Sequence, residues 1–179
     1  MTTTDDQMAE RRCELSSELY FYLRRHVQAM ATAAGAPTIE RPAWPGSLST
    51  TTYAEPLAGL REAVSLRSSA ERVIEDYAKY ARVEGVSWRE IGEALGLAAD
   101  EAGRSVAELA YEQVVGQPDL WSQVNMYWTC PACGQNVTDR GPYDSHPLDN
   151  EHGHAEDCSR MAAAVAAWQA ERDRWEAGG

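Results

Sequence analysis

The sequence predicts a mainly α fold, in which a helical domain is followed by a small module with a hairpin and a helix. Apolar residues recur at helical spacing over residues 5–34 and 57–116, which is the pattern of amphipathic helices. Beyond residue 128 the pattern changes to clustered cysteines and histidines with polar turns, which indicates a compact piece of different construction. We therefore expect an N-terminal helix over 1–34, a linker over 35–56, a helical domain over 57–116 and the small module over 117–179.

Composition and charge restrict the class of protein. The chain of 179 residues is 44% hydrophobic, which is enough for a core, and its 16 basic and 28 acidic residues give a net charge of −12. Fifteen arginines against a single lysine are typical of high-GC, actinobacterial genomes. No apolar run approaches the ~18 residues that a membrane span needs, and the acidic start lacks the build of a signal peptide. We therefore expect a cytoplasmic protein with no membrane partner.

The excess of acidic residues also restricts how the chain could bind nucleic acids. Broad, sequence-independent binding needs many cations that neutralise phosphates, and the chain has an excess of carboxylates instead. This argues against such binding but leaves room for a local DNA-reading surface.

Residues 5–34 are expected to form one uninterrupted helix. The stretch contains no Pro and no Gly, and Gly35 and Pro37 follow it as stop signals. Its apolar positions are Met8, Leu15, Leu19, Tyr22, Leu23, His26, Val27 and Met30. We expect this side to be buried or to form the contact of a homodimer. Residues 35–56 hold four prolines and are predicted to be an irregular linker.

The domain over 57–116 is expected to contain several helices, with breaks near Ser68-Ser69, Gly85 and Gly96. Ser87-Trp-Arg-Glu90 is a capping box, in which the Ser hydroxyl and the Glu carboxylate each satisfy a backbone N–H, so a short helix begins there. Gly96-Leu97 makes the next turn, and a longer helix is expected from about Ala99 to Val115. Trp88 is expected to belong to the core rather than to stack on a base.

This stretch resembles the helix-turn-helix of sigma-factor region 4 and related bacterial regulators. The resemblance lies in Ala81-Arg82-x-x-Gly85-Val86-Ser87-Trp88-x-x-Ile91-Gly92-x-Ala94-Leu95-Gly96-Leu97. It implies that the second helix places its N-terminal side chains in the major groove of DNA. The residues that would contact DNA are Arg82, Ser87, Arg89, Arg104 and Ser105.

The sequence departs from that family where bases would be read. Ala98, Ala99, Asp100 and Glu101 occupy places that usually hold base-reading side chains, and carboxylates repel phosphates. Gly103 falls inside the expected second helix, where it costs about 1 kcal/mol relative to Ala. Two interpretations therefore stay open: a DNA-binding unit, and a three-helix core that no longer touches DNA.

The last segment carries the pattern C-x2-C-x20-H-x3-C, formed by Cys130, Cys133, His154 and Cys158. Zinc takes four such ligands in a tetrahedron, and a small module with few aliphatic residues needs a staple of this kind. His154 and Cys158 are four residues apart, so they would face the same way at the start of a last helix over 155–176. Four protein ligands leave no open position, which predicts one structural Zn²⁺ and not a catalytic one.

Other assignments of these residues stay open. His152, and after it His146, are the rival ligands to His154. The cysteines could instead form a disulfide, a redox pair or free thiols. Cys13 lies in the first helix and is expected to be a buried thiol outside the site.

The same segment resembles a C-terminal module found in uncharacterised actinobacterial proteins. The shared residues are Cys130-Pro-x-Cys133-Gly134, Val137-Thr138-Asp139, Gly141-Pro142-Tyr143, His146-Pro147, Asp149-Asn150-Glu151 and Gly153-His154-Ala155-x-x-Cys158. That family is defined by its zinc-binding pattern, so the resemblance implies a metal and no particular activity. The acidic loop 139–157 is either a binding surface or a solvated loop around the metal.

No catalytic constellation is visible. The sequence has no Gly-rich phosphate loop and no Ser/His/Asp or Cys/His set outside the zinc pattern, so we expect no enzyme. The leading hypothesis is a cytoplasmic DNA-binding protein that regulates transcription. The alternative is an acidic protein-interaction module, in which the acidic helices or the 139–157 loop dock a basic partner.

Overall fold

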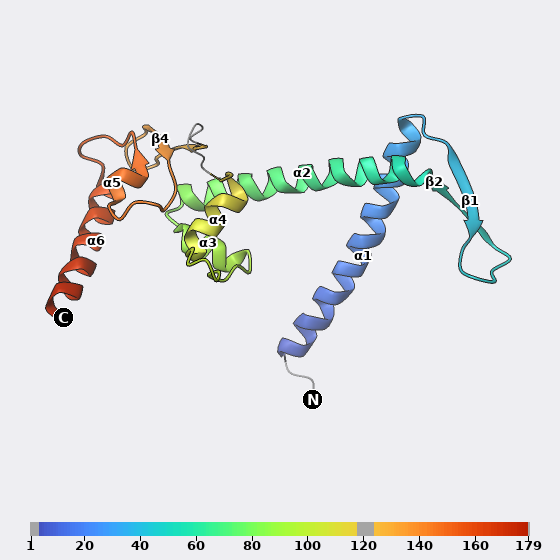
Figure 1. Ribbon diagram of the computed structural model, residues 1–179, viewed down its shortest axis with the longest axis horizontal. Coiled ribbons are helices and arrows are strands. Elements are labelled where there is room, and N and C mark those ends of the chain that lie inside the picture. The colour runs from blue at the N-terminus through green and yellow to red at the C-terminus, as the bar shows by residue number, and fades with distance from the viewer. Residues whose placement is uncertain (1–3, 118–123, 179) are drawn as a thin grey trace. The chain divides into compact units, whose positions relative to one another are not determined.

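The computed structural model describes residues 4–117 and 124–178 (Figure 1). The chain divides into two compact units, Met1–Ala70 and Glu71–Gly179. The elements in order are α1 (Thr4–Ala33), β1 (Thr38–Pro42), β2 (Thr50–Ala54), α2 (Pro56–Val83), α3 (Trp88–Ala94), α4 (Val106–Val114), β3 (Met126–Thr129), β4 (Asn136–Asp139), α5 (Pro147–Asn150), β5 (Glu151–His152) and α6 (Ser159–Gly178). The predicted mainly α fold is confirmed. None of the described helices has the combination of length and hydropathy that crossing a membrane requires.

The first unit begins with α1, which is continuous as predicted. It ends where Gly35 adopts a positive φ of 80° and the N–H of Ala36 donates to the carbonyl of Ala31 at 3.0 Å, a left-handed helix cap that favours glycine. Most of the apolar side chains of α1 are exposed within this unit. Their expected burial inside the fold is therefore wrong, and their role in a homodimer contact stays a prediction.

The predicted irregular linker over 35–56 is wrong, because this stretch contains an antiparallel hairpin. Strand β1 pairs with β2 in a register that sets Thr38 opposite Ala54 and Pro42 opposite Thr50. The prolines do not prevent this pairing, since Pro42 ends its strand and a two-stranded ribbon consists of edge strands. The run Thr50–Tyr53 is rich in the β-branched and aromatic residues that strands favour, and it was the signal for a hairpin.

Helix α2 runs without interruption, so the predicted break at Ser68-Ser69 is also wrong (Figure 1). The hydroxyl of Ser69 donates to the carbonyl of Ser65 at 3.1 Å, which satisfies this polar side chain inside the helix. At the other end, Gly85 has a positive φ of 94° and ends the helix as expected.

The second unit contains the short helix α3, whose predicted capping box is present. Ser87 accepts from the N–H of Glu90, and the Glu90 carboxylate accepts from the N–H of Ser87 at 2.9 Å. The burial of Trp88 in the core is confirmed, and its ring lies 5.0 Å from that of Tyr111 in an edge-to-face contact.

The prediction of a longer helix from about Ala99 is wrong, because α4 begins only at Val106. Ser105 caps it in a second capping box with Glu108, and Gly103 lies before it with a positive φ of 85°. Residues 95–105 therefore form a long connection, whereas a helix-turn-helix has a turn of about 3–4 residues. The acidic residues that were expected to open the reading helix, Asp100 and Glu101, lie in this connection instead.

Helices α3 and α4 pack closely through Gly92. A Cβ at this position would lie 2.6 Å from Cγ1 of Val106 and 2.7 Å from the Val106 carbonyl oxygen, so only glycine fits without movement. The close approach of α3 to α4 therefore depends on the absence of a side chain at position 92.

The cysteine-bearing segment forms a three-stranded sheet in the order β3-β4-β5, followed by α6. The last helix begins at Ser159 and not at residue 155, so its predicted start is wrong. One core joins this sheet to the helices, with buried members that include Trp88, Tyr111, Met126, Trp128, Val137 and Met161. The expected domains over 57–116 and 117–179 therefore share one core, and residues 118–123 of the expected small module lie outside the described residues.

Candidate metal centre

Cys130, Cys133, His154 and Cys158 come together in the second unit, with one ligand atom of each lying within 4.8 Å of the others. Cys130 follows β3, Cys133 lies in the turn before β4, His154 follows β5 and Cys158 directly precedes α6. All four cysteines are free thiols, so the described residues contain no disulfide and the alternative of a disulfide is wrong. Cys13 is exposed on α1 and outside the cluster, so its expected burial is wrong.

The first two ligands are held by a tight turn between β3 and β4. The N–H of Gly134 donates to the carbonyl of Cys130 at 2.7 Å, and the N–H of Cys130 donates to the carbonyl of Gln135 at 2.9 Å. The N–H of Ala155, and after it that of Gln135, holds the pKa of the Cys133 thiol down at about 6, whereas burial raises the pKa of Cys130. These two backbone donors thus favour a thiolate at Cys133, which is the form that binds metals.

The other two ligands converge for a reason that differs from the predicted one. His154 and Cys158 do not share a helical face, because they lie in the turn before α6, where the N–H of Cys158 donates to the carbonyl of Ala155 at 3.0 Å. Gly153 precedes them with a positive φ of 96°, and a Cβ there would lie 2.5 Å from the carbonyl oxygen of Asn136. Close passage of the chain over β4 therefore positions His154.

The rival histidines do not belong to the cluster. Nδ1 of His146 accepts from the N–H of Leu148 at 3.2 Å, and its ring packs on Trp168. Nε2 of His152 lies 3.2 Å from the carbonyl oxygen of Asp149. Each rival is thus occupied with its own neighbours.

The distances within the cluster fit a tetrahedral zinc site. Zinc–sulfur bonds of ~2.3 Å and zinc–nitrogen bonds of ~2.0 Å imply tetrahedron edges of about 3.8 Å between sulfurs and about 3.5 Å between sulfur and nitrogen. The sulfurs of Cys130 and Cys158 lie 3.8 Å apart, and Nδ1 of His154 lies 3.3 Å from the sulfur of Cys158 and 3.8 Å from that of Cys133. The donor set and its spacing therefore suit one ion.

A carboxylate outside the ligand set orients the histidine. Oε2 of Glu151 lies 3.0 Å from Nε2 of His154, so the Nδ1 atom is left to face the three sulfurs. Metal-binding histidines generally have such a partner, which fixes the tautomer and the ring orientation. This role of Glu151 was not predicted from the sequence, although its place three residues before His154 was the available signal.

The other oxygen of Glu151 accepts from Arg82, which connects the cluster to α2. The Arg82 guanidinium also donates to Oδ2 of Asp139 at 2.8 Å and to the carbonyl of Val86 at 2.6 Å. Asp139 is 1% exposed and accepts in addition from Trp88 and from the N–H of Gly141. These buried charges are thus paired and hydrogen-bonded, as burial requires.

A second arginine joins α6 to the end of α2. Arg160 donates to the carbonyls of Val83 at 2.7 Å and Arg82 at 2.6 Å, which lie in the last turn of α2, where carbonyls have no N–H four residues further on to pair with. Its guanidinium also lies 4.3 Å above the ring of Trp128, next to His154. The metal-binding segment and the helices are therefore one interlocked structure.

The residues expected to contact DNA are placed differently from the prediction. Arg82 is 8% exposed and forms ion pairs with Asp139 and Glu151, so its guanidinium is not available for the expected phosphate contact. Arg104 is paired with Asp100 and with Glu112, each at 2.6 Å. The remaining three are Ser87 and Ser105, which cap helices, and Arg89, which is exposed and paired with Glu93 at 3.0 Å.

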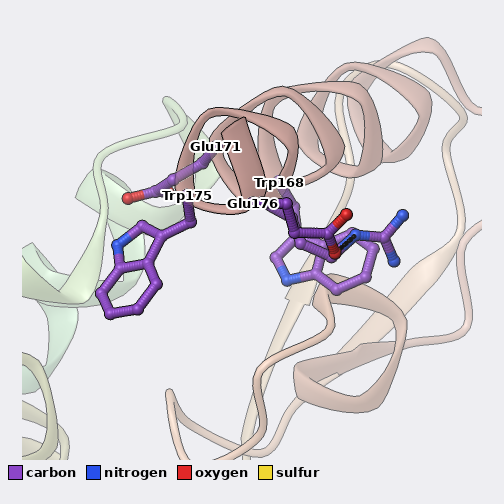
Figure 2. Close-up of a pocket in the computed structure, with 5 residues that line it drawn as sticks. Trp168, Glu171, Trp175 and Glu176 are labelled. Atoms are coloured by element: carbon purple, nitrogen blue, oxygen red, sulfur yellow. Dashed lines mark ion pairs between the residues drawn. The ribbon is translucent and has the colours of Figure 1, made fainter. Parts of the chain in front are cut away.

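A separate shallow pocket of about 460 Å³ lies on α6 (Figure 2). Trp168, Glu171, Arg172, Trp175 and Glu176 line it. The Arg172 guanidinium lies 5.0 Å from the ring of Trp168, and Trp175 is 84% exposed. Figure 2 shows both indole rings on the same side of the helix, with the Glu171 carboxylate beside Trp175. We call this surface the aromatic–acidic face.

The chain matches no protein-family model, no curated protein and no solved structure. The two resemblances drawn from sequence motifs therefore stay predictions.

Proposed function

We propose that this chain is a non-catalytic protein-interaction module, stabilised by one structural zinc ion, which docks a basic segment of a partner protein. Three thiolates and one imidazole form a donor set that zinc prefers, and four protein ligands leave no position for a substrate. The Glu151 contact to His154 and the shared core support a role of the ion in holding the second unit together.

We choose a basic protein segment over DNA as the partner because two of the arginines expected to contact DNA are already paired within the chain. Arg82 and Arg104, which the helix-turn-helix interpretation assigns to DNA, are held by carboxylates of the same chain. Residues 71–179 contain nine basic and twenty acidic residues, a net charge of −11. Binding to phosphates requires available cations, whereas this charge attracts a basic partner.

The aromatic–acidic face offers the chemistry for such a partner. Arg172 already shows how a guanidinium lies on Trp168 while pairing with Glu176 at 3.6 Å. Trp175 presents a second, exposed ring beside the carboxylate of Glu171 (Figure 2). A cation stacked on an aromatic ring next to a carboxylate gains from both contacts, and tryptophan is enriched at the energetic centres of interfaces.

The test is fluorescence anisotropy with the zinc-loaded full chain and a labelled helical peptide built from Leu, Lys and Arg. We expect saturable binding at one site that Trp175→Ala weakens by about tenfold. The double variant Glu171→Gln with Glu176→Gln should weaken it as well. Trp44→Ala is the matched control, because Trp44 is an equally large exposed ring in the first unit. Equal binding by the wild type and Trp175→Ala would overturn the assigned surface.

The same assay with labelled fragments of the genomic DNA, across a salt series, tests the competing function. Saturable and fragment-selective binding that weakens steeply with salt, and that Arg89→Ala with Arg104→Ala abolishes, would establish a DNA-reading regulator instead. We expect no such binding.

A further inference from the structure

Helix α1 presents an apolar stripe formed by Met8, Leu15, Leu19 and Tyr22, which follow one another at steps of seven, four and three residues. These side chains are 48–74% exposed. The contacts of α1 within its unit use another side of the helix, where Gln28 donates to the carbonyl of Thr52 and Arg24 lies over the ring of Tyr53. The stripe is therefore left uncovered by the rest of the unit.

The first unit lacks a core of its own. Among residues 6–70, whose burial the structure describes, Ala31 is the only buried one. Helices of this kind obtain most of their stability from packing an apolar face and not from intrinsic propensity. A second surface must therefore cover the stripe for α1 to be stable as one long helix.

We infer that a second copy of this chain covers the stripe, with the two α1 helices antiparallel. The charges along α1 favour this occupant: residues 6–18 hold four acidic and two basic residues, whereas residues 19–33 hold two basic and no acidic residues. An antiparallel pair sets the acidic half of each copy against the basic half of the other. A parallel pair would instead place the two acidic halves together and the two basic halves together.

The residues on the two flanks of the stripe also favour the antiparallel orientation. One flank carries charges at a spacing of seven, Arg11, Glu18 and Arg25, and the other carries the uncharged Ala9, Ser16, Leu23 and Met30. In a parallel pair the charged flank of one helix meets the uncharged flank of the other, so no ion pair forms. In an antiparallel pair the charged flanks meet, and Glu18 of each copy lies beside Arg25 of the other.

This register also aligns the apolar positions. With Glu18 beside Arg25 of the second copy, Leu19 lies beside Tyr22 and Leu15 beside His26. Each contact occurs twice about a two-fold axis, so the interface closes on itself as a dimer and leaves no stripe exposed.

The test is sedimentation velocity of the zinc-loaded full chain across a wide concentration series. We expect a monomer–dimer equilibrium that Leu15→Glu with Leu19→Glu abolishes. Tyr20→Glu is the matched control, because Tyr20 is an exposed apolar residue of the same helix outside the stripe. A chain that is monomeric throughout, or a dimer that the stripe variant leaves unchanged, would overturn the proposal.

Charge exchange tests the orientation. Glu18→Arg and Arg25→Glu should each weaken the dimer by about fivefold, and the double variant should restore it, because the exchanged charges again face each other. Failure of the double variant to restore the dimer contradicts the antiparallel arrangement. Zinc content, measured on every variant, reports on the second unit, and Trp175→Ala should leave the dimer unchanged, which separates this proposal from that of the basic partner.

Discussion

Glu151 accepts a partly buried hydrogen bond from Arg82 with one carboxylate oxygen and holds His154 with the other. Arg82 lies at the end of α2 and His154 is a candidate metal ligand, so a single side chain links the helices to the metal centre. The occupancy of the centre and the stability of the helices should therefore depend on each other.

Replacing Glu151 with Gln should weaken zinc binding by roughly 10–100-fold, because the neutral amide orients and polarises His154 less well. A chelator competition assay measures this affinity. Glu156→Gln is the matched control, since Glu156 lies on the same loop, is exposed and has no described contact with the cluster. Equal affinities of the two variants would show that Glu151 does not support the histidine.

Replacing Arg82 with Met should destabilise the second unit by about 3–5 kcal/mol, because Asp139 is left as a buried charge without its cation. Urea unfolding of the zinc-loaded chain measures the change. Arg89→Ala removes only an exposed pair with Glu93 and should alter the free energy of unfolding by about 0.5 kcal/mol or less. If both variants unfold alike, the buried pair contributes no more than a surface pair.

Removal of the metal should unfold α3 and α4 together with the sheet, because Trp88, Tyr111 and Trp128 belong to one core. Native mass spectrometry should find one zinc per chain, which Cys130→Ser loses. Circular dichroism and tryptophan emission, recorded before and after a chelator, follow the helices. A metal-free wild type with unchanged spectra would contradict the structural role of the ion.

The sequence could predict the metal ligands because their identity depends on spacing and residue type alone. The reason given for His154 and Cys158 was nevertheless wrong, since a turn and not a helical face brings them together. The capping box at Ser87 was predicted from four adjacent residues. The equivalent box at Ser105 was overlooked, so the following helix was placed too early.

The role of Arg82 could not be predicted from its surroundings in the sequence. Its partners Asp139 and Glu151 are 57 and 69 residues away, so an arginine at the end of a helix resembles a surface cation until the sheet is in place. The hairpin over β1 and β2 was missed for a local reason, because its prolines were weighed above its run of threonines.

Replacing Gly92 with Ala should destabilise the second unit by about 1–3 kcal/mol, because the added methyl group meets Val106 of α4 at 2.6 Å. Gly59→Ala is the matched control within α2, where an added Cβ meets nothing within 4 Å. That substitution should stabilise the helix by up to about 1 kcal/mol. Thermal unfolding of both variants separates the effect of packing from that of helix propensity.

The two capping boxes provide a test by pH. Hydrogen bonds from the hydroxyl and then the N–H of Ser87 hold the pKa of Glu90 below its ordinary value of 4.5. At Glu108 the N–H of Ser105 is the larger cause of the lowered pKa. A lowered pKa means that each carboxylate stabilises the fold above pH 4.5 and that this contribution is lost as the pH falls through the folded-state pKa.

Ser87→Ala should therefore raise the pKa of Glu90 toward 4.5 and leave that of Glu108 unchanged. Ser105→Ala should raise the pKa of Glu108 by less than Ser87→Ala raises that of Glu90, because the N–H of residue 105, which is the larger cause at Glu108, remains. A carboxyl-detected NMR titration of the zinc-loaded chain measures both groups in the same sample. If Ser87→Ala leaves the pKa of Glu90 in place, the hydroxyl does not hold the carboxylate, and the start of α3 depends on the backbone contact alone.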